Sequence, residues 1–302
     1  MRISSDPEAR LERALLSLEG LSVGDGFGER FFAAEHAPLI ATRTPPPGPW
    51  PTTDDTAMAL GVVEVLARHG SIVRDELARV FGERYRSEPW RGYGSGAHRI
   101  LQAIADGVQW TSAASLVFGG VGSLGNGAAM RAPPLGAWFA DDPGRLVDEA
   151  RASAEVTHLH PEGQAGAIAV AVAAAWAVHA RGGSRDGHAL LAAAAEHTPP
   201  GETRQGIVRA LSVPFDADVR SAAEELGNGS GAIAPDTVPF ALWCAARHLD
   251  DFECAMWSCV EAGGDVDTLC AIVGGIVAPF VGLEGIPWAW RDRREPLAVP
   301  TR

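Results

Sequence analysis

Apolar residues recur mostly at spacings of three and four along the chain, and alanine is abundant among them. This periodicity is typical of helices, and alanine has the highest intrinsic helix propensity. No alternating apolar and polar run is long enough to predict a strand. The sequence therefore predicts an all-α fold, with a first helix after Asp6 and Pro7 and further helices over residues 56–68, 73–83, 96–106, 144–155, 162–180, 187–196, 202–212, 217–226, 237–249, 251–262 and 268–281.

The segments between these helices are short and are marked by glycine and proline. Residues 44–52 contain five prolines and cannot continue a helix, so they lead the chain stiffly to Thr53. No turn is long enough to be a linker between domains, and no repeat of fixed period is present. We therefore expect one compact multi-helix domain over residues 1–302.

The formal net charge of −13 opposes general binding to nucleic acid, whose phosphates would be repelled. The four cysteines match no zinc motif, and their apolar surroundings predict free buried thiols in a reducing cytoplasm. The N-terminus has no apolar signal core. The most apolar run, residues 165–180, is shorter than the roughly 20 residues of a membrane span, which favours a buried core helix. We expect a cytoplasmic monomer that does not bind membranes.

Two short segments each combine a pair of carboxylates with hydroxyl groups. Residues 53–56 read Thr-Asp-Asp-Thr, and residues 263–268 read Gly-Gly-Asp-Val-Asp-Thr. One carboxylate suffices to cap a helix, and two acids at the start of a buried helix repel each other unless a cation lies there. Oxygen ligands without imidazole or thiolate suit hard cations such as Mg²⁺ or Mn²⁺. The pattern predicts a site for two divalent cations, with the candidate ligands Thr53, Asp54, Asp55, Asp265, Asp267 and Thr268.

Other segments combine glycines with polar groups and could approach a ligand closely. Residues 24–30 place two acids among three glycines, and residues 91–96 form a glycine loop with one aromatic residue. Residues 125–131 (Gly-Asn-Gly-Ala-Ala-Met-Arg) form a further loop, and residues 157–161 offer two imidazoles. The GxGxxG order is absent, so a dinucleotide-binding fold is not supported.

In this order, these segments resemble the ADP-ribosylglycohydrolase family, which includes the dinitrogenase reductase-activating glycohydrolases. The matching motifs lie at residues 20–28, 53–56, 125–136, 157–161 and 263–268, and they extend over nearly the whole chain. The resemblance implies an all-α fold around a binuclear Mg²⁺ or Mn²⁺ centre. It also implies hydrolysis of the N- or O-glycosidic bond between ADP-ribose and an acceptor. The implied substrate-binding residues are Gly94, Ser95, Gly96, Gly125, Asn126, Gly127, Met130, Arg131 and His158.

This chain departs from the family at one position. Many members have a glutamate four residues after the last glycine of the Gly-Asp-x-x-Gly motif, and Phe32 occupies that position here. If the segment is helical, Glu29 lies on the same face and is the candidate acid/base, because residues three apart are neighbours on a helix. Glu35 is the alternative. Asp54 and Asp267 are the cluster carboxylates that we expect to take part in catalysis.

Two other functions stay open at this point. The chain could bind ADP-ribose without turnover, which the unusual glutamate position favours. It could also be an all-helical metal-dependent phosphohydrolase, although such sites usually add several histidine ligands. The sequence does not indicate whether the acceptor is arginine, serine, a nucleic-acid end or a small molecule.

Overall fold

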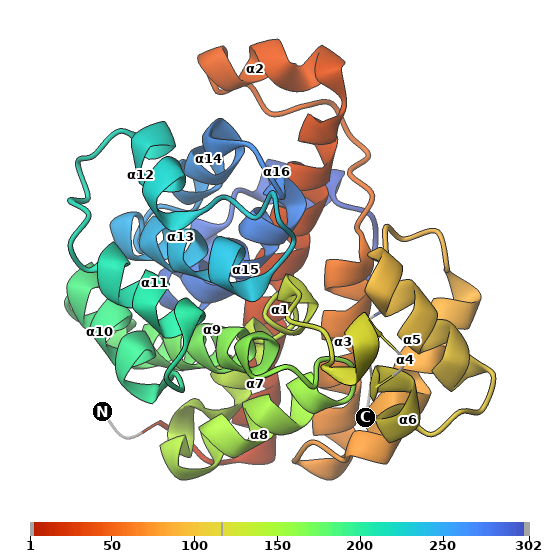
Figure 1. Ribbon diagram of the computed structural model, residues 1–302. Helices are drawn as coiled ribbons and strands as arrows, with labels where there is room; N and C mark the ends of the chain where they lie inside the picture. The colour runs from red at the N-terminus through yellow and green to blue at the C-terminus, as the bar shows by residue number, and fades with distance from the viewer. Residues whose placement is uncertain (1–2, 116, 299–302) are drawn as a thin grey trace.

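The computed structural model describes residues 3–115 and 117–298, and within these residues the regular structure is helical (Figure 1). The only β-type pairings described are two isolated bridges, Trp50 with Arg294 and Gly125 with Ile233. The α-helices are α1 Pro7–Glu29, α2 Ala37–Thr42, α3 Asp54–His69, α4 Arg74–Ser87, α5 Ser95–Ala105, α6 Trp110–Ser115, α7 Pro133–Trp138, α8 Pro143–Glu155, α9 Pro161–Ala180, α10 Gly187–His197, α11 Glu202–Ala210, α12 Val219–Leu226, α13 Ala234–Arg247, α14 Phe252–Ala262, α15 Val266–Val281 and α16 Trp288–Arg293.

The predicted all-α class is confirmed, and each helix predicted from periodicity is present with small shifts at its ends. The sequence prediction omitted α2, α6, α7 and α16. Each of these has 6 residues. A six-residue helix has fewer than two turns, so the three-to-four spacing has no room to repeat.

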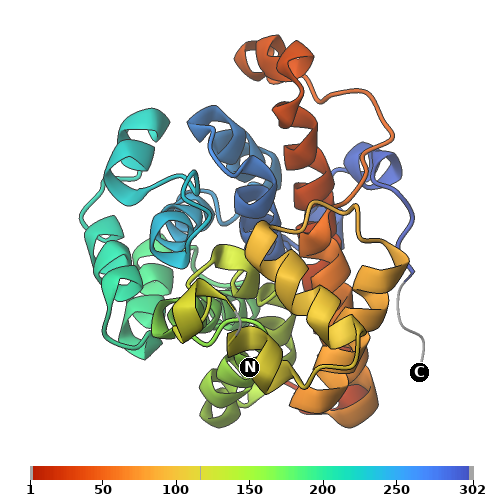
Figure 2. The ribbon, with the colours of Figure 1, turned by 45° about the vertical axis from the view of Figure 1, so that its right-hand side comes forward.

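The long helix α1 runs through the middle of the molecule, with different groups of helices on either side. Figure 1 shows α4, α5 and α6 on one side and α10, α11 and α12 on the other. In the turned view of Figure 2, α4 still lies on the opposite side of α1 from α10, α11 and α12. Helices α3 and α15 pack against α1 between these groups. The amino-terminal ends of α3 and α15 carry the two acidic segments, so the packing of three helices decides whether these segments meet.

A stripe of glycines on α1 allows its backbone to approach α15 closely. Gly20, Gly24 and Gly28 are spaced by four and therefore lie on one helix face. A Cβ atom on Gly24 would lie 2.1 Å from the carbonyl oxygen of Cys270, far inside van der Waals contact. A Cβ on Gly28 would lie 2.7 Å from the Cα of Asp267. The stripe therefore brings the end of α1 against the first turn of α15.

Helix α9 is the one helix in the described residues that is long and apolar enough to span a membrane by length and composition. Of its most apolar window, 72% is buried inside the fold. The core helix of a globular protein passes the same test. Residues such as Ile168 and Val170 have no exposed surface and pack in the main hydrophobic core.

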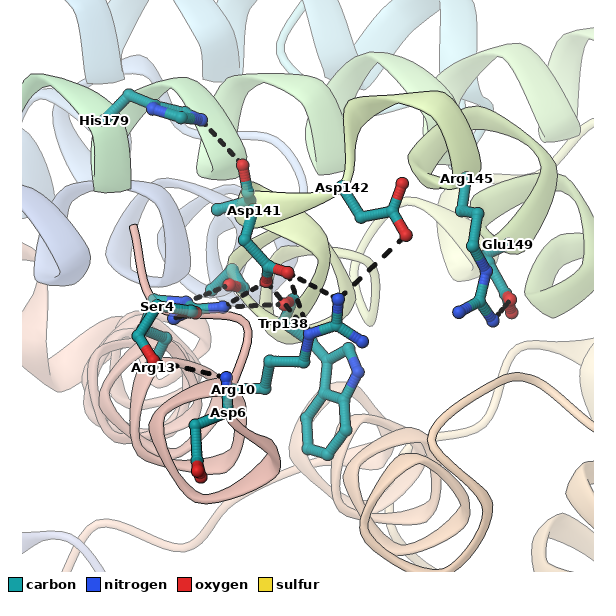
Figure 3. Close-up of polar contacts among 12 residues, drawn as sticks. Ser4, Asp6, Arg10, Arg13, Trp138, Asp141, Asp142, Arg145, Glu149 and His179 are labelled. Atoms are coloured by element: carbon teal, nitrogen blue, oxygen red, sulfur yellow. Dashed lines mark hydrogen bonds and ion pairs between the residues drawn. The ribbon is translucent and has the colours of Figure 1, made fainter. Parts of the chain in front are cut away.

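The beginning of α1 is held by a cluster of ion pairs (Figure 3). Arg10 Nε donates to both carboxylate oxygens of Asp141 at 3.0 Å, and Arg13 also pairs with Asp141. Arg13 further donates to the carbonyl oxygens of Ala137 and Trp138. The carboxylate of Asp141 is only 3% exposed, so this contact is better shielded than a surface ion pair. It fixes α1 at the end opposite to Asp25 and Glu29.

Candidate metal centre and its two cavities

Three carboxylates from three different helices meet where α1, α3 and α15 pack together. Asp25, Asp55 and Asp267 each offer an oxygen, and these oxygens all lie within 4.8 Å of one another. Asp25 and Asp55 are almost completely buried. Such a group of carboxylates is suited to a hard divalent cation, which takes oxygen ligands.

Asp25 is held by the turn that begins α3. Thr53 N donates to its Oδ2 at 2.9 Å, and Thr56 N and Oγ1 donate to the same oxygen at 3.2 and 2.5 Å. Thr53 Oγ1 lies 2.9 Å from Asp25 Oδ1 and 3.0 Å from Asp55 Oδ2. A threonine hydroxyl has one proton to donate, so it cannot satisfy both carboxylates at once. The hydroxyl therefore links the two acids without neutralising them.

The second acidic segment is fixed by neighbours outside α15. Asn126 Nδ2 donates to Asp265 Oδ2 at 2.6 Å and lies 3.0 Å from Thr237 Oγ1. Thr268 Oγ1 lies 3.5 Å from Asp55 Oδ2, across the junction of α3 and α15. The two segments that the sequence analysis paired are thus brought together.

The pKa values of these carboxylates are raised, mainly because burial removes the water that would solvate their charge. The pKa of Asp25 rises to about 6 and that of Asp54 to about 7, the latter also because of the charge of Asp25. The pKa values of Asp55 and Asp267 lie well above the ordinary range, where burial acts first and repulsion from neighbouring aspartates second. The protein alone leaves this negative charge poorly compensated.

The residues present fit the metal centre that the sequence predicts. Asp55 Oδ1 and Asp267 Oδ1 are buried and have no hydrogen-bond partner in the described part of the chain. A buried polar atom without a partner costs about 1–3 kcal/mol, and more when it is charged. Divalent cations bound between these carboxylates would supply the missing partner for both oxygens.

A cavity of about 440 Å³, here called the inner cavity, opens beside the cluster. Four of the aspartates line it, together with both glycine loops and His158. The first turns of α3, α5 and α15 all reach it. Of the predicted site residues, the inner cavity is lined by Asp54, Asp55, Gly94, Ser95, Gly96, Gly125, Asn126, Gly127, Met130, Arg131, His158, Asp265, Asp267 and Thr268.

Arg131 lies behind the 125–131 loop and is completely buried. Its guanidinium donates to the carbonyl oxygens of Gly127 at 3.1 Å and Ser153 at 2.8 Å, and to Thr157 Oγ1 at 2.9 Å. It also lies over the ring of Phe81, 4.7 Å from the ring centroid. Burial lowers the pKa of Arg131 to about 9. These contacts support the loop from behind.

The same arginine orients His158. Thr157 Oγ1 accepts from Arg131 and lies 2.7 Å from His158 Nδ1. Because the guanidinium can only donate, the threonine proton is available to Nδ1, which leaves the proton of the neutral imidazole on Nε2. Burial, followed by the charge of Arg131, lowers the pKa of His158 to about 3. His158 is therefore a neutral donor beside the glycine loop, where a Cβ on Gly127 would lie 3.3 Å from Nε2.

Glu29 and Thr53 line a different cavity of about 650 Å³, here called the outer cavity. Asp265 and Asp267 line both cavities, so the two meet at the acidic cluster. Burial raises the pKa of Glu29. Phe32 also lines the outer cavity. Glu35, the alternative acid, has a side chain that is 79% exposed beside His36 and lines neither cavity.

One member of the cluster, Asp25, was not among the predicted ligands, although it is one of the two acids among the glycines of residues 24–30. The useful signal is the four-residue glycine spacing, which places Asp25 next to the helix face that contacts α15. Phe118 and the 231–233 loop also line the inner cavity and were not predicted from the sequence. The second imidazole, His160, caps α9 by accepting from Glu162 N.

The family profile, the relatives and the solved structure to which this chain is similar all point to one family. A sequence profile of the ADP-ribosylglycohydrolase family matches residues 6–299. ADP-ribosylhydrolase ARH3 of Danio rerio is 28% identical over 94% of this chain and 87% of the relative. ADP-ribosylhydrolase ARH3 of Homo sapiens is 26% identical over 80% of this chain and 74% of the relative. A solved structure described as an ADP-ribosylglycohydrolase-related protein complex superposes with a TM-score of 0.67 at 28% identity, covering 95% of this chain and 93% of that one.

The helical fold, the carboxylate cluster and the profile match together define the class. The chain belongs to the ADP-ribosylglycohydrolase family. It is accordingly a hydrolase that acts on the glycosidic bonds of ADP-ribose.

Proposed function

We propose that this protein hydrolyses the bond between ADP-ribose and its acceptor with the help of two divalent cations, Mg²⁺ or Mn²⁺. The observation that carries this proposal is the meeting of Asp25, Asp55 and Asp267, with two buried carboxylate oxygens that have no partner in the described residues. Asp54, Asp265, Thr53 and Thr268 complete the set of candidate ligands. When bound, the cations would polarise the ribose hydroxyls and lower the pKa of a water molecule.

The inner cavity provides groups for the ADP-ribose moiety. The first turn of α5, at Ser95 and Gly96, has backbone N–H groups without acceptors inside the helix, and the helix dipole favours an anion there. Gly125 and Gly127 leave room for a ligand beside His158. We expect the diphosphate at these N–H groups and His158 Nε2–H at a ligand oxygen. Arg131 would act through the loop that it supports.

Glu29 is the proposed proton acceptor. Its carboxylate is half-buried in the outer cavity, which meets the inner cavity at the aspartate cluster. Water attacks the anomeric carbon, and Glu29 would take the proton that this water loses. Burial raises the pKa of Glu29 toward neutral pH. A general base is most effective when its pKa lies near the pH at which the enzyme works.

The proposed setting is the cytoplasm, with the protein acting as a monomer on ADP-ribosylated acceptors and without general affinity for nucleic acid or membranes. The four cysteines are free, which supports a reducing compartment.

The proposal is tested with a panel of ADP-ribosylated acceptors incubated with Mg²⁺, Mn²⁺ or excess chelator. We expect ADP-ribose to be released only with a divalent cation. In calorimetry, ADP-ribose should bind more tightly when the cation is present. Full activity in chelator would refute the metal centre, and binding of ADP-ribose without release from any acceptor would instead support a binding protein.

A further inference from the structure

The end of α16 and the residues that follow it lie alongside the proline-rich segment that leads into α3. Trp50 N donates to the carbonyl oxygen of Arg293 at 2.6 Å, and Glu295 N donates to the carbonyl oxygen of Trp50 at 2.9 Å. These two bonds pair residues 293–295 with residues 50–52 in the manner of a short parallel bridge. The pairing brings the side chain of Glu295 to Thr52, which is 243 positions away in the chain.

One oxygen of the Glu295 carboxylate joins two segments of the site. Oε1 accepts from Thr52 N at 2.9 Å, from Thr52 Oγ1 at 2.6 Å and from Arg91 Nη1. Arg91 Nη1 also donates to the carbonyl oxygen of Thr52 at 2.8 Å. The side chains of Glu295 and Arg91 are 28% and 17% exposed, so water screens their contact less than it screens a surface ion pair. Glu295 therefore holds Thr52 and Arg91 together.

The first partner, Thr52, is joined by its peptide bond to a candidate metal ligand. The next residue, Thr53, donates from N and Oγ1 to the two carboxylate oxygens of Asp25, at 2.9 Å each. Because a peptide unit is rigid, fixing Thr52 N and Oγ1 also limits where Thr53 and its bonds to Asp25 can lie. The contact with Glu295 thus reaches the carboxylate cluster through one residue.

The second partner, Arg91, reaches the cluster through its backbone. Asp54 N, at the first position of α3, has no acceptor inside its own helix and donates to the carbonyl oxygen of Arg91 at 2.7 Å. The residue after Arg91 is Gly92, which lines both cavities, and a Cβ there would lie 3.7 Å from Asp54 Oδ1. Holding Arg91 in place therefore also holds the amino-terminal end of α3.

We propose that Glu295 is a positioning residue of the metal centre, which sets the places of Thr53 and Asp54 through Thr52 and Arg91. This inference rests on the proposed function. Groups that orient metal ligands from outside typically contribute about 10–100-fold to metal affinity. Glu295 acts through its two partners and forms no bond to a candidate ligand itself in the described residues. We therefore expect its contribution to lie at the lower end of this range.

The test measures binding of Mn²⁺ to the whole chain, by calorimetry and by the EPR signal of free Mn²⁺. Glu295→Ala should raise the Kd of Mn²⁺ about tenfold. Glu295→Gln keeps an oxygen that can accept from Thr52 and Arg91, so it should restore most of the affinity. Turnover of Glu295→Ala should fall at limiting Mn²⁺, and saturating Mn²⁺ should recover most of it, because the substitution removes no metal ligand.

A second variant tests whether Glu295 and Arg91 act through one link. Arg91→Ala removes the guanidinium but keeps the backbone carbonyl that accepts from Asp54 N. It should raise the Kd of Mn²⁺ in the same direction as Glu295→Ala. Groups in one hydrogen-bond network are not additive, so the double variant should bind Mn²⁺ no more weakly than the weaker single variant. Effects that multiply in the double variant would overturn the inference.

The matched control is Glu19→Ala. Glu19 accepts from Arg291 Nε at 3.1 Å and from Arg294 Nη2 at 3.0 Å, so it holds the same chain segment without a bond to residues 52–54 in the described structure. Its side chain is 20% exposed, close to the 28% of Glu295. Glu19→Ala should leave the Kd of Mn²⁺ unchanged. An equal rise in this control would show that only the general attachment of the segment matters, which overturns the inference.

The remaining outcomes separate the inference from the proposed function. If the wild type binds Mn²⁺ and the Kd of Glu295→Ala equals that of the wild type, the positioning role is wrong and the proposed function stands. If Glu295→Gln binds Mn²⁺ as weakly as Glu295→Ala, the hydrogen bonds from Thr52 do not carry the effect, and the inference is overturned. If the wild type does not bind Mn²⁺ or Mg²⁺, the proposed function fails and the inference fails with it.

Discussion

Replacing Asp55 by asparagine should change the stability of the protein in opposite directions with and without metal. The substitution preserves shape and keeps an oxygen for the hydroxyls of Thr53 and Thr268, but it removes one buried negative charge. In chelator the wild-type protein must bury this charge among other aspartates or protonate it. The asparagine variant avoids that cost, so we expect it to be more stable than the wild type when no cation is present.

The magnitude follows from the neighbouring carboxylates. The pKa of Asp25 is raised from 3.8 to about 6 and that of Asp54 from 3.8 to about 7. One pKa unit corresponds to about 1.4 kcal/mol, so burying each of these ionised groups costs about 3–4 kcal/mol at neutral pH. Asp55 is 1% exposed, between Asp25 at 0% and Asp54 at 8%, so its replacement should recover an amount of this order in chelator. For a chain of this length that is a rise in Tm of several degrees.

Saturating cation should reverse the order of stability, so that the wild type becomes more stable than the Asp55→Asn variant. A ligand present at about 100 times its Kd stabilises the folded state by about 2.7 kcal/mol. The wild type should gain this stabilisation, whereas the asparagine variant should gain little and should lose metal-dependent turnover. Differential scanning fluorimetry with Mg²⁺, Mn²⁺ and chelator measures both effects. Asp148→Asn, at a carboxylate that is 78% exposed, is the control and should respond to metal as the wild type does. The reasoning would be refuted if Asp55→Asn were less stable than the wild type in chelator. It would also be refuted if metal raised the Tm of Asp55→Asn as much as that of the wild type.

Three further predictions concern packing, protonation and catalysis. Gly24→Ala should lower the free energy of unfolding by about 3 kcal/mol in a denaturant titration, because its Cβ would meet the backbone of α15. Gly144→Ala should be nearly neutral, because its Cβ would make only an ordinary contact with Asp142 Oδ1 at 3.6 Å. The pKa of His158 is lowered to about 3, so below pH 6.5 the unfolded chain takes up a proton at this residue while the folded chain does not. The buried aspartates act in the opposite sense but are the same in both proteins, so the free energy of unfolding of the wild type relative to His158→Gln should fall by about 2 kcal/mol between pH 7 and pH 5. Glu29→Gln should reduce turnover by at least tenfold and leave ADP-ribose affinity nearly unchanged, whereas Glu35→Gln should have no effect; the opposite pattern would move the acid/base role to Glu35.

Much of the fold could be predicted because its signals are local. The three-to-four periodicity indicated the long helices, and glycine and proline marked their ends. The two acidic segments were recognisable because each places two carboxylates at the start of a buried helix, which capping alone does not require. The short helices α6 and α7 were not predicted, since too few residues form them and their positions depend on the neighbours against which they pack.

The sequence alone determined the helical class, the two acidic segments, the glycine loops and the family resemblance, because these depend on residues that are close in the chain or occur in a fixed order. Tertiary structure decided which of these groups meet. Asp25 joins the cluster because glycines on α1 allow its backbone to touch α15, and no local pattern states which helix fills that space. Arg131 is withdrawn into hydrogen bonds behind the loop, and Glu29 faces the outer cavity because α1 ends there. Helix periodicity fixes which side chains share a face, but only the packing of several helices fixes what that face meets.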